Sequence, residues 1–159
     1  MSKILVAYFS PTRHTAKLAT NLSKVINGDL YEIKPLKMYS ASDLDWTDKN
    51  SRSSKEMQDK TSRPAIITAD LPNMTEYSVV FVGFPIWWYI APTIVNTFLE
   101  ACDLSGKTVV PFATSGGSGM GKTNDYLRPS CKGAILKEGK VFSPSVSGNE
   151  LKKWAENKF

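Results

Sequence analysis

The stretch that decides the fold is Lys3-Ile-Leu-Val-Ala-Tyr-Phe9, followed directly by Ser10-Pro-Thr-Arg-His-Thr15. Its first part is a near-continuous apolar run, which is typical of a strand buried on both faces of a parallel sheet. Its second part is rich in hydroxyl groups, and Thr12 is placed to cap a helix. The apolar residues between Ala16 and Ile26 recur at helical spacing, and Gly28 marks the expected helix end. A strand, a polar loop and a helix in this order predict the first unit of an α/β fold.

The rest of the chain repeats this alternation of strands and helices. Apolar runs rich in Val, Ile and Phe predict the further strands, and amphipathic spacing predicts the further helices. The expected strands are 30–33, 78–84, 107–113 and 134–136, the last resuming at Val141, and the expected helices are 91–101, one beginning at 122–127, and 150–157. Five strands that alternate with helices predict a parallel sheet with helices on both faces.

Residues 35–63 form a polar stretch that interrupts this pattern. We expect an irregular excursion after the second strand, with an exposed helix near residues 50–60. Long segments of this kind are usually functional or mobile. Because the chain has no internal repeat and no long Pro/Gly/Ser linker, residues 1–159 are predicted to be a single domain.

The composition excludes several classes of protein. The chain of 159 residues has one His and two Cys, so it cannot build a four-ligand Cys/His zinc site. Any Ser-His-Asp or Cys-His mechanism would have to use His14. We therefore assign neither a catalytic side chain nor a metal site. Cys102 and Cys131 lack C-x-x-C spacing and are expected to be inert thiols in a reducing cytoplasm.

The distribution of charged and apolar residues along the chain indicates which kinds of partner to expect. The formal net charge is +5, with 11 basic and 9 acidic residues up to residue 80 and 9 and 6 after it. A nucleic-acid surface would show clustered Lys and Arg, so no nucleic-acid partner is expected. No apolar stretch approaches the ~20 residues that span a bilayer, and nothing resembles a signal peptide, so no membrane span is expected.

Three loops follow the predicted central strands, at the sheet edge where such folds bind ligands. The first loop offers the hydroxyls of Ser10, Thr12 and Thr15 together with the charged or polar side chains of Arg13 and His14. Hydroxyls and free backbone N–H groups at a helix N-terminus suit a phosphate. The alternative is that Ser10 and Thr12 only cap the helix.

The second loop is aromatic. It contains Pro85, Ile86, Trp87, Trp88 and Tyr89 in succession. Three neighbouring rings cannot all enter one core, so at least one should face a groove, where a flat aromatic ligand would be a natural partner. The alternative is that the Trp side chains only cover the sheet edge.

The third loop begins with Thr114, Ser115, Gly116, Gly117 and Ser118. Glycines at this density let the backbone approach a ligand closely, although a plain flexible connection has the same composition.

A competing interpretation of the third loop is a nucleotide triphosphatase. Residues 116–123 match the pattern G-x-x-x-x-G-K-[ST] between a strand and a helix. That fold also needs a magnesium-holding Asp after another apolar strand. The first two apolar strands end in Phe9-Ser10 and Gly83-Phe84, and only 36 residues follow Thr123. We therefore regard the match as accidental.

A phosphate cradle, aromatic faces and a glycine-lined edge together suit FMN. With these three loops the sequence resembles the flavodoxin family, and the resemblance covers essentially the whole chain. The resemblance implies a five-stranded sheet of order 2-1-3-4-5 and non-covalent FMN, with the ring beside Trp87 and Trp88 and with residues 114–118 along its edge. The Pro-Ile-Trp-Trp loop is similar to that of a short bacterial subgroup.

Two residues depart from the family pattern. Arg13 stands where the family usually has Gly, which changes the loop or adds a charged contact to the phosphate. Tyr89 stands where the subgroup is expected to have Gly, and no Gly lies between Phe84 and Leu104. Since Gly eases a peptide turn beside the flavin, its absence predicts that two-electron chemistry is favoured over one-electron chemistry.

The resemblance implies an FMN-binding redox protein of the flavodoxin electron-transfer type, whose partner is a redox protein or a small-molecule acceptor. The alternative is an FMN-dependent NAD(P)H:quinone or small-molecule reductase. A receiver-type signalling domain is rejected, because the positions that would hold its acidic pair and phosphorylatable Asp are Ser10 and Pro85. The oligomeric state is left open.

Overall fold

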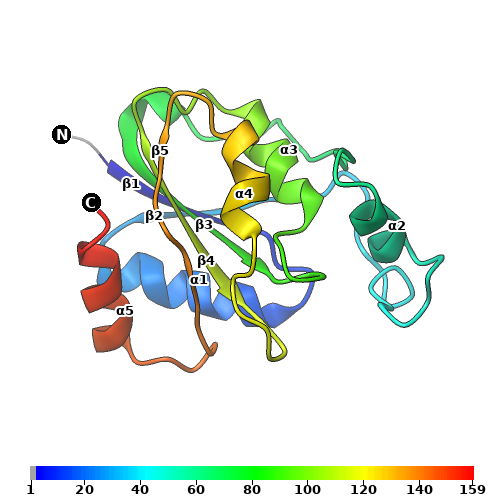
Figure 1. Cartoon of the computed structure of the whole chain (residues 1–159). Helices are drawn as coiled ribbons and strands as arrows, with labels where there is room; N and C mark the ends of the chain where they lie inside the picture. Colours follow the sequence, from blue (N-terminus) through cyan, green and yellow to red (C-terminus); the bar gives the residue numbers. More distant parts are fainter. Residues whose placement is uncertain (1–2) are drawn as a thin grey trace.

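A computed structural model describes residues 3–159 as a parallel sheet between two layers of helices (Figure 1). The strands are β1 (Lys3–Tyr8), β2 (Asp29–Glu32), β3 (Tyr77–Pro85), β4 (Thr108–Thr114), β5 (Ile135–Leu136) and β6 (Lys140–Val141). The α-helices are α1 (Arg13–Val25), α2 (Arg52–Gln58), α3 (Thr93–Ala101), α4 (Thr123–Leu127) and α5 (Gly148–Glu156), with short 3-10 turns at Met74–Glu76 and Arg128–Ser130. Strands β1 to β5 and helices α3 and α5 begin and end within two residues of the boundaries expected from the sequence.

The order of the sheet is β2-β1-β3-β4-β5, with β6 also pairing β4. Every pairing is parallel, and Phe81 at the centre lies opposite Val6 on one side and Val110 on the other. This confirms the predicted fold class and strand order. The fifth strand is split into two pieces, β5 and β6, which confirms that it resumes at Val141.

Helices α1 and α5 cover one face of the sheet, and α3 and α4 cover the other (Figure 1). Helix α1 buries Leu18, Ala19 and Leu22 against the strand residues Val6 and Phe81. Residues of opposite pleat in the same strands, such as Leu5 and Val80, belong to the core on the α3 side. The strands are therefore apolar on both faces, which explains their near-continuous hydrophobic runs.

The two ends of α1 differ in detail from the expectation. Thr12 occupies the N-cap position, but its side chain makes no capping hydrogen bond within the described chain. Instead Ser10 Oγ accepts a hydrogen bond from the Ala16 N–H at 3.0 Å. At the other end, Asn27 rather than Gly28 takes the left-handed conformation, with φ of 55°. Asn tolerates this region better than most residues, so the glycine is not needed there.

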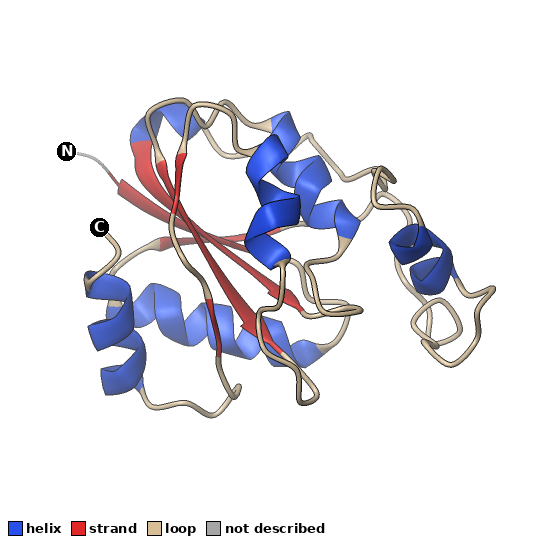
Figure 2. Cartoon of the chain, in the orientation of Figure 1, coloured by secondary structure: helices blue, strands red, loops and turns tan. Residues whose placement is uncertain are grey.

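The predicted excursion projects from the edge of the sheet, with α2 at its far side (Figure 2). Its two ends are pinned together, because the Ile67 N–H donates to the Lys34 carbonyl at 2.8 Å and the Leu36 N–H donates to the Ala65 carbonyl at 2.9 Å. The exposed helix expected near 50–60 is shorter, and one of its faces is buried instead of exposed. Met57 is buried together with Ser53 and Ser54, because these residues share one face of α2.

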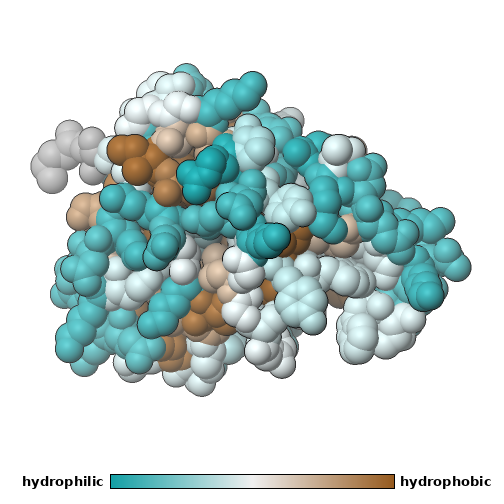
Figure 3. Space-filling view, in the orientation of Figure 1, coloured by the Kyte–Doolittle hydropathy of each residue, from teal (hydrophilic) through white to brown (hydrophobic). Residues whose placement is uncertain are grey.

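No helix among residues 3–159 is both long and apolar enough to cross a membrane. On the face drawn in Figure 3, hydrophilic residues are distributed over many elements and hydrophobic patches are small.

Candidate functional site

The candidate site lies at the carboxyl end of the sheet, where the strand order reverses. The chain leaves β1 toward β2 on one side and returns to β3 on the other, so the loops after β1, β3 and β4 lie side by side. Backbone hydrogen bonds extend past the strands and join these loops. The Phe9 N–H donates to the Gly83 carbonyl, and the Ile86 N–H donates to the Thr114 carbonyl, both at 2.9 Å.

A cleft of about 660 Å³ opens between these loops. Ten of the fifteen predicted site residues line it: Thr12, Pro85, Ile86, Trp87, Trp88, Tyr89, Ser115, Gly116, Gly117 and Ser118. Ser10, Arg13, His14, Thr15 and Thr114 do not line the cleft; four of them stand beside Thr12 in the first loop and the first turn of α1. The structure thus brings the three loops together, while contact with a cofactor stays a prediction.

Two of the predicted hydroxyls in the first loop form hydrogen bonds to other groups of the protein. Ser10 Oγ donates to the Thr12 carbonyl and accepts from Ala16, and Thr15 Oγ1 lies 2.8 Å from Thr114 Oγ1 in a buried contact. The Thr15 contact ties the first loop to the end of β4. Thr12 remains exposed, with its Oγ1 3.3 Å from His14 Nδ1. The N-terminus of α1 has no acidic residue in its first turn, so it favours an anion.

The second loop makes a tight turn through two left-handed residues. Trp88 and Tyr89 have φ values of 49° and 69°, and Trp87 and Ile90 exchange backbone hydrogen bonds of 2.9 and 3.2 Å across the turn. This conformation normally uses Asn or Gly, and each non-glycine residue held there costs about 1 kcal/mol or more. Gly121 backs the turn, since a Cβ built on it would lie 2.4 Å from the Tyr89 carbonyl oxygen.

The turn separates the roles of its three aromatic side chains. Trp87 packs edge-to-face on Phe9 and Tyr39, with both ring centroids 5.7 Å away, and so joins the cleft to the core. Trp88 is 40% exposed and Tyr89 is 69% exposed. The interpretation of the Trp residues as cover for the sheet edge fits the packing of Trp87, which also lines the cleft, but not the exposed ring of Trp88.

The third loop is organised by one hydroxyl. Ser115 Oγ accepts from the N–H groups of Gly117 at 3.1 Å and Ser118 at 2.8 Å. A Cβ built on Gly116 or Gly117 would meet nothing within 4 Å, so the backbone of this loop is open to the cleft. The loop is held by its own hydrogen bonds and its backbone can be approached closely, while its contact with a ligand stays a prediction.

The nucleotide triphosphatase interpretation of this loop gains no support. Helix α4, which follows the matched motif, has only five residues. The Thr123 side chain is fully buried and its hydroxyl donates to the Met120 carbonyl, so it does not face a metal-bound phosphate.

Sequence reasoning missed one wall of the cleft. Leu44, Trp46 and Ser53 from the excursion line it opposite the loops. Pro11, in the first loop, also lines the cleft and was not among the predicted site residues. Periodicity gave no indication of this wall. The one available signal was a Trp within a polar stretch, at position 46.

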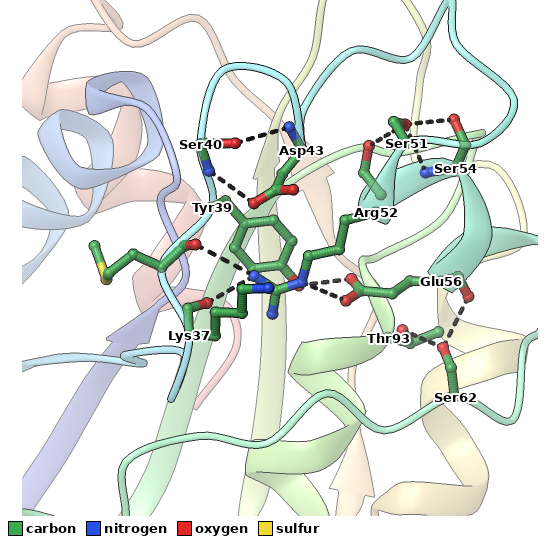
Figure 4. A network of polar contacts seen from close by, with 12 residues as sticks. Lys37, Tyr39, Ser40, Asp43, Ser51, Arg52, Ser54, Glu56, Ser62 and Thr93 are labelled. Atoms are coloured by element: carbon green, nitrogen blue, oxygen red, sulfur yellow. Dashed lines mark hydrogen bonds and ion pairs between the residues drawn. The ribbon is translucent and has the colours of Figure 1, made fainter.

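A polar network holds this wall in place (Figure 4). The Tyr39 hydroxyl donates to Glu56 Oε1 at 2.6 Å, and Arg52 Nε donates to Glu56 Oε2 at 2.9 Å. The Arg52 guanidinium also lies 3.7 Å from the centre of the Tyr39 ring. Burial, and then the hydrogen bond to Glu56, raise the pKa of Tyr39 far above its ordinary value. Tyr39 stays neutral as a donor, and it links α2 to Trp87.

The chemistry of the cleft suits a cofactor with a phosphate and a flat ring. None of its fourteen lining residues is charged. Thr12 at the N-terminus of α1 contributes one of the lining hydroxyls, and indole rings and open glycine backbone line other parts of the cleft. A pocket of this volume and apolar character is typical of a drug-sized ligand. No cluster of three His, Cys, Asp or Glu residues suited to a metal occurs within residues 3–159.

Comparison with known proteins gives a consistent result. The family model described as Flavodoxin matches residues 3–158. A solved structure of a candidate flavoprotein from Bacteroides eggerthii is 47% identical, with a TM-score of 0.92 over 99% of this chain and 98% of that one. A second, from Bacteroides uniformis, is 45% identical, with a TM-score of 0.91 over 98% of both chains. A Lactobacillus acidophilus flavoprotein in complex with FMN is 22% identical, with a TM-score of 0.73 over 98% and 99% of the chains. No curated protein matched.

Proposed function

Since the chain belongs to the flavodoxin family, we propose that its cleft binds FMN non-covalently and that the protein transfers electrons through this flavin. One observation carries the proposal: the three loops at the strand-order reversal form a single uncharged cleft of about 660 Å³ with a helix N-terminus at one end. The fold similarity to a flavoprotein in complex with FMN supports the same cofactor.

The first loop holds the phosphate in this proposal. Thr12 offers an exposed hydroxyl, and the backbone N–H groups at the start of α1, apart from that of Ala16, offer donors beside the positive end of the helix dipole. Arg13 and His14 are exposed at the same turn and add donors or charge. Ser10 and Thr15 act indirectly, because their hydroxyls hold the loop and α1 in position.

The second and third loops hold the ring system. Trp88 and Tyr89 present exposed rings, and the open backbone of residues 115–118 lies along an edge. The flavin supplies the redox chemistry when bound, and the protein supplies orientation and electrostatics. The left-handed turn at Trp88 and Tyr89 lacks the glycine that would let its peptides turn easily, which supports a preference for two-electron over one-electron chemistry.

The proposal includes membership of the short bacterial subgroup that has a Pro-Ile-Trp-Trp loop. It also includes a location in the cytoplasm. Both cysteines are free, which supports a reducing compartment. The partner is a redox protein or a small-molecule acceptor. Because the net charge is +5, a protein partner would differ from those that recognise acidic carriers by charge.

A reconstitution experiment tests the cofactor. The purified protein should be yellow, release FMN on denaturation and rebind it stoichiometrically. Thr12→Ala should weaken FMN binding by about ten- to hundredfold, because a hydrogen bond to a charged group contributes about 1.5–3 kcal/mol. Thr75→Ala is the matched control, since Thr75 is an exposed threonine before β3, at the other end of the sheet. A colourless protein that fails to rebind FMN would refute the proposal.

A further inference from the structure

The positive charge of the chain is concentrated in one layer of the fold. The two halves of the sequence carry similar excesses of Lys and Arg, but α1 and residues 140–159 together hold seven of the 20 basic residues and only two of the 15 acidic ones. This layer therefore accounts for the whole formal net charge of +5, and the rest of the chain has 13 residues of each sign.

The basic residues of α1 form one stripe. Arg13, Lys17 and Lys24 are spaced by four and seven residues, which places them on the same side of the helix, along about 16 Å of its axis. All three are exposed, and α1 contains no acidic residue. The stripe begins at the cleft, because Arg13 follows Thr12, which lines it. Positive charge therefore extends from the edge of the candidate flavin site along the length of α1.

Helix α5 continues this charge beyond the end of α1 (Figure 1). The start of α5 packs on the end of α1, since a Cβ built on Gly148 would lie 3.2 Å from a methyl carbon of Val25. Lys152 and Lys153 are both exposed on α5. We call the exposed side of these two helices, with their basic residues, the α1–α5 face.

The charges of this layer have no ionic partner among residues 3–159. The four ion pairs found there involve neither α1 nor residues 140–159. Lys140 Nζ instead lies 5.3 Å from the centre of the Phe142 ring, and Lys158 Nζ lies 5.7 Å from that of Trp154, on the same side of the sheet as α1. Unpaired charges of one sign repel one another in the folded protein, so their concentration in one layer indicates an anionic partner.

The chemistry of the α1–α5 face favours an acidic protein over a nucleic acid or a membrane. Glu150 and Glu156 flank the lysines of α5, and a continuous row of phosphates would meet both. One of the seven basic residues is Arg, the side chain best suited to bind phosphate through two hydrogen bonds. Helices that bind membranes insert apolar side chains, and neither α1 nor α5 exposes a large one. Separate carboxylates on a protein surface can instead match individual lysines.

We propose that the α1–α5 face docks an acidic redox protein and so holds this partner beside the cleft. The inference rests on the proposed FMN function and specifies the partner by its charge. Lys17 and Lys24 attract the partner without taking part in FMN binding, because only Arg13 of the stripe is also assigned to the phosphate. Exposed charges act over about 10 Å at 0.1 M salt, so the attraction steers the approach of the partner and weakens as salt is added.

The binding test uses the full chain, labelled with 15N, loaded with FMN and oxidised. It is titrated with an oxidised plant-type [2Fe–2S] ferredoxin, which is a small acidic redox protein, and separately with oxidised cytochrome c, which is a small basic one. At about 50 mM salt, the ferredoxin should shift the amide signals of residues 13–25 and 148–156. Its affinity should fall about tenfold at about 300 mM salt. Cytochrome c should leave these signals unchanged.

Charge-reversed variants locate the docking surface. Lys17→Glu/Lys24→Glu should weaken ferredoxin binding about tenfold at low salt, and Lys17→Gln/Lys24→Gln about threefold. Lys55→Glu/Lys132→Glu is the matched control, because it changes the net charge by the same amount at two exposed lysines outside the α1–α5 face. The control should keep its affinity for ferredoxin within about twofold of the wild type.

Three results would overturn the docking face. They are failure of the ferredoxin to bind at low salt, equal losses of affinity in the two charge-reversed variants, and tighter binding of a random-sequence DNA duplex or of phosphatidylserine vesicles to the same residues. The dissociation constant of FMN is measured in parallel. Failure of the wild type to bind FMN would refute the proposed function. Loss of ferredoxin binding in Lys17→Glu/Lys24→Glu with unchanged FMN affinity would support the docking face.

Discussion

The sheet end and the excursion build opposite walls of the same cleft by different means. The loop-bearing strands β1, β3 and β4 are held by buried apolar side chains on both faces, and backbone hydrogen bonds continue past the strand ends. The excursion instead depends on local polar contacts, such as those between Ser40 and Asp43 and between Arg52, Glu56 and Tyr39. Packing fixes one wall, whereas a small number of polar side chains fix the other. We therefore expect that a substitution which destabilises one wall leaves the other wall folded.

The largest effect is expected at Gly83, in the packed wall. A Cβ built on this residue would lie 2.3 Å from Cζ of Phe112, whose ring is fully buried. Gly83→Ala must move that ring or the strand, and overpacking of this kind costs about 3 kcal/mol. Urea unfolding followed by circular dichroism measures the loss.

Gly119→Ala is the control for this substitution. A Cβ on Gly119 would meet nothing within 4 Å, so the free energy of unfolding should change by less than about 0.5 kcal/mol. Equal losses for the two variants would show that the close contact with Phe112 does not limit the packing of the sheet.

The second effect concerns the polar wall. Glu56→Gln removes the charge that Arg52 contacts at 2.9 Å and weakens the bond from Tyr39, in a pair whose side chains are only 19% and 15% exposed. The expected cost is about 2 kcal/mol, confined to the excursion. Hydrogen exchange should speed up in residues 40–60 and stay unchanged in β3 and β4. A uniform increase throughout the chain would show that the two walls unfold as one unit.

The third effect lies at the Trp88–Tyr89 turn, which belongs to the sheet-end wall and lines the cleft. Gly121 has φ of 53° and backs the Tyr89 carbonyl, so Gly121→Ala combines backbone strain with a close contact. We expect a loss of about 1–2 kcal/mol and a shift of the Trp88–Tyr89 turn. Gly106→Ala has similar backbone strain, with φ of 77°, and no neighbour within 4 Å. If both variants bind FMN equally well, the turn does not depend on Gly121.

The same difference between the walls explains which parts of the fold and of the site could be predicted from the sequence. Apolar runs such as residues 78–84 predicted the strands, because a strand buried on both faces must be apolar throughout. The loop residues followed, because the carboxyl ends of parallel strands meet at one edge. The wall containing Trp46 was not predicted, because side-chain hydrogen bonds between residues such as Tyr39 and Glu56 leave no periodic signal. The capping alternative covered the bond between Ser10 and the start of α1, but nothing in the sequence showed that the Thr15 hydroxyl contacts Thr114.

The smallest effect involves Cys131, which is 5% exposed and belongs to the packed core, whereas the excursion contains no cysteine. Burial raises the pKa of the Cys131 thiol to about 11 from its ordinary value near 9. The folded protein therefore keeps a proton that the unfolded chain releases, and stability is full below pH 9 and falls as the pH rises toward 11. The loss should be about 1 kcal/mol at pH 9.5. The difference between wild type and Cys131→Ala isolates this thiol from the lysines and tyrosines that titrate in the same range. A difference that stays constant from pH 8 to pH 10 would show that burial in the packed core does not perturb the thiol.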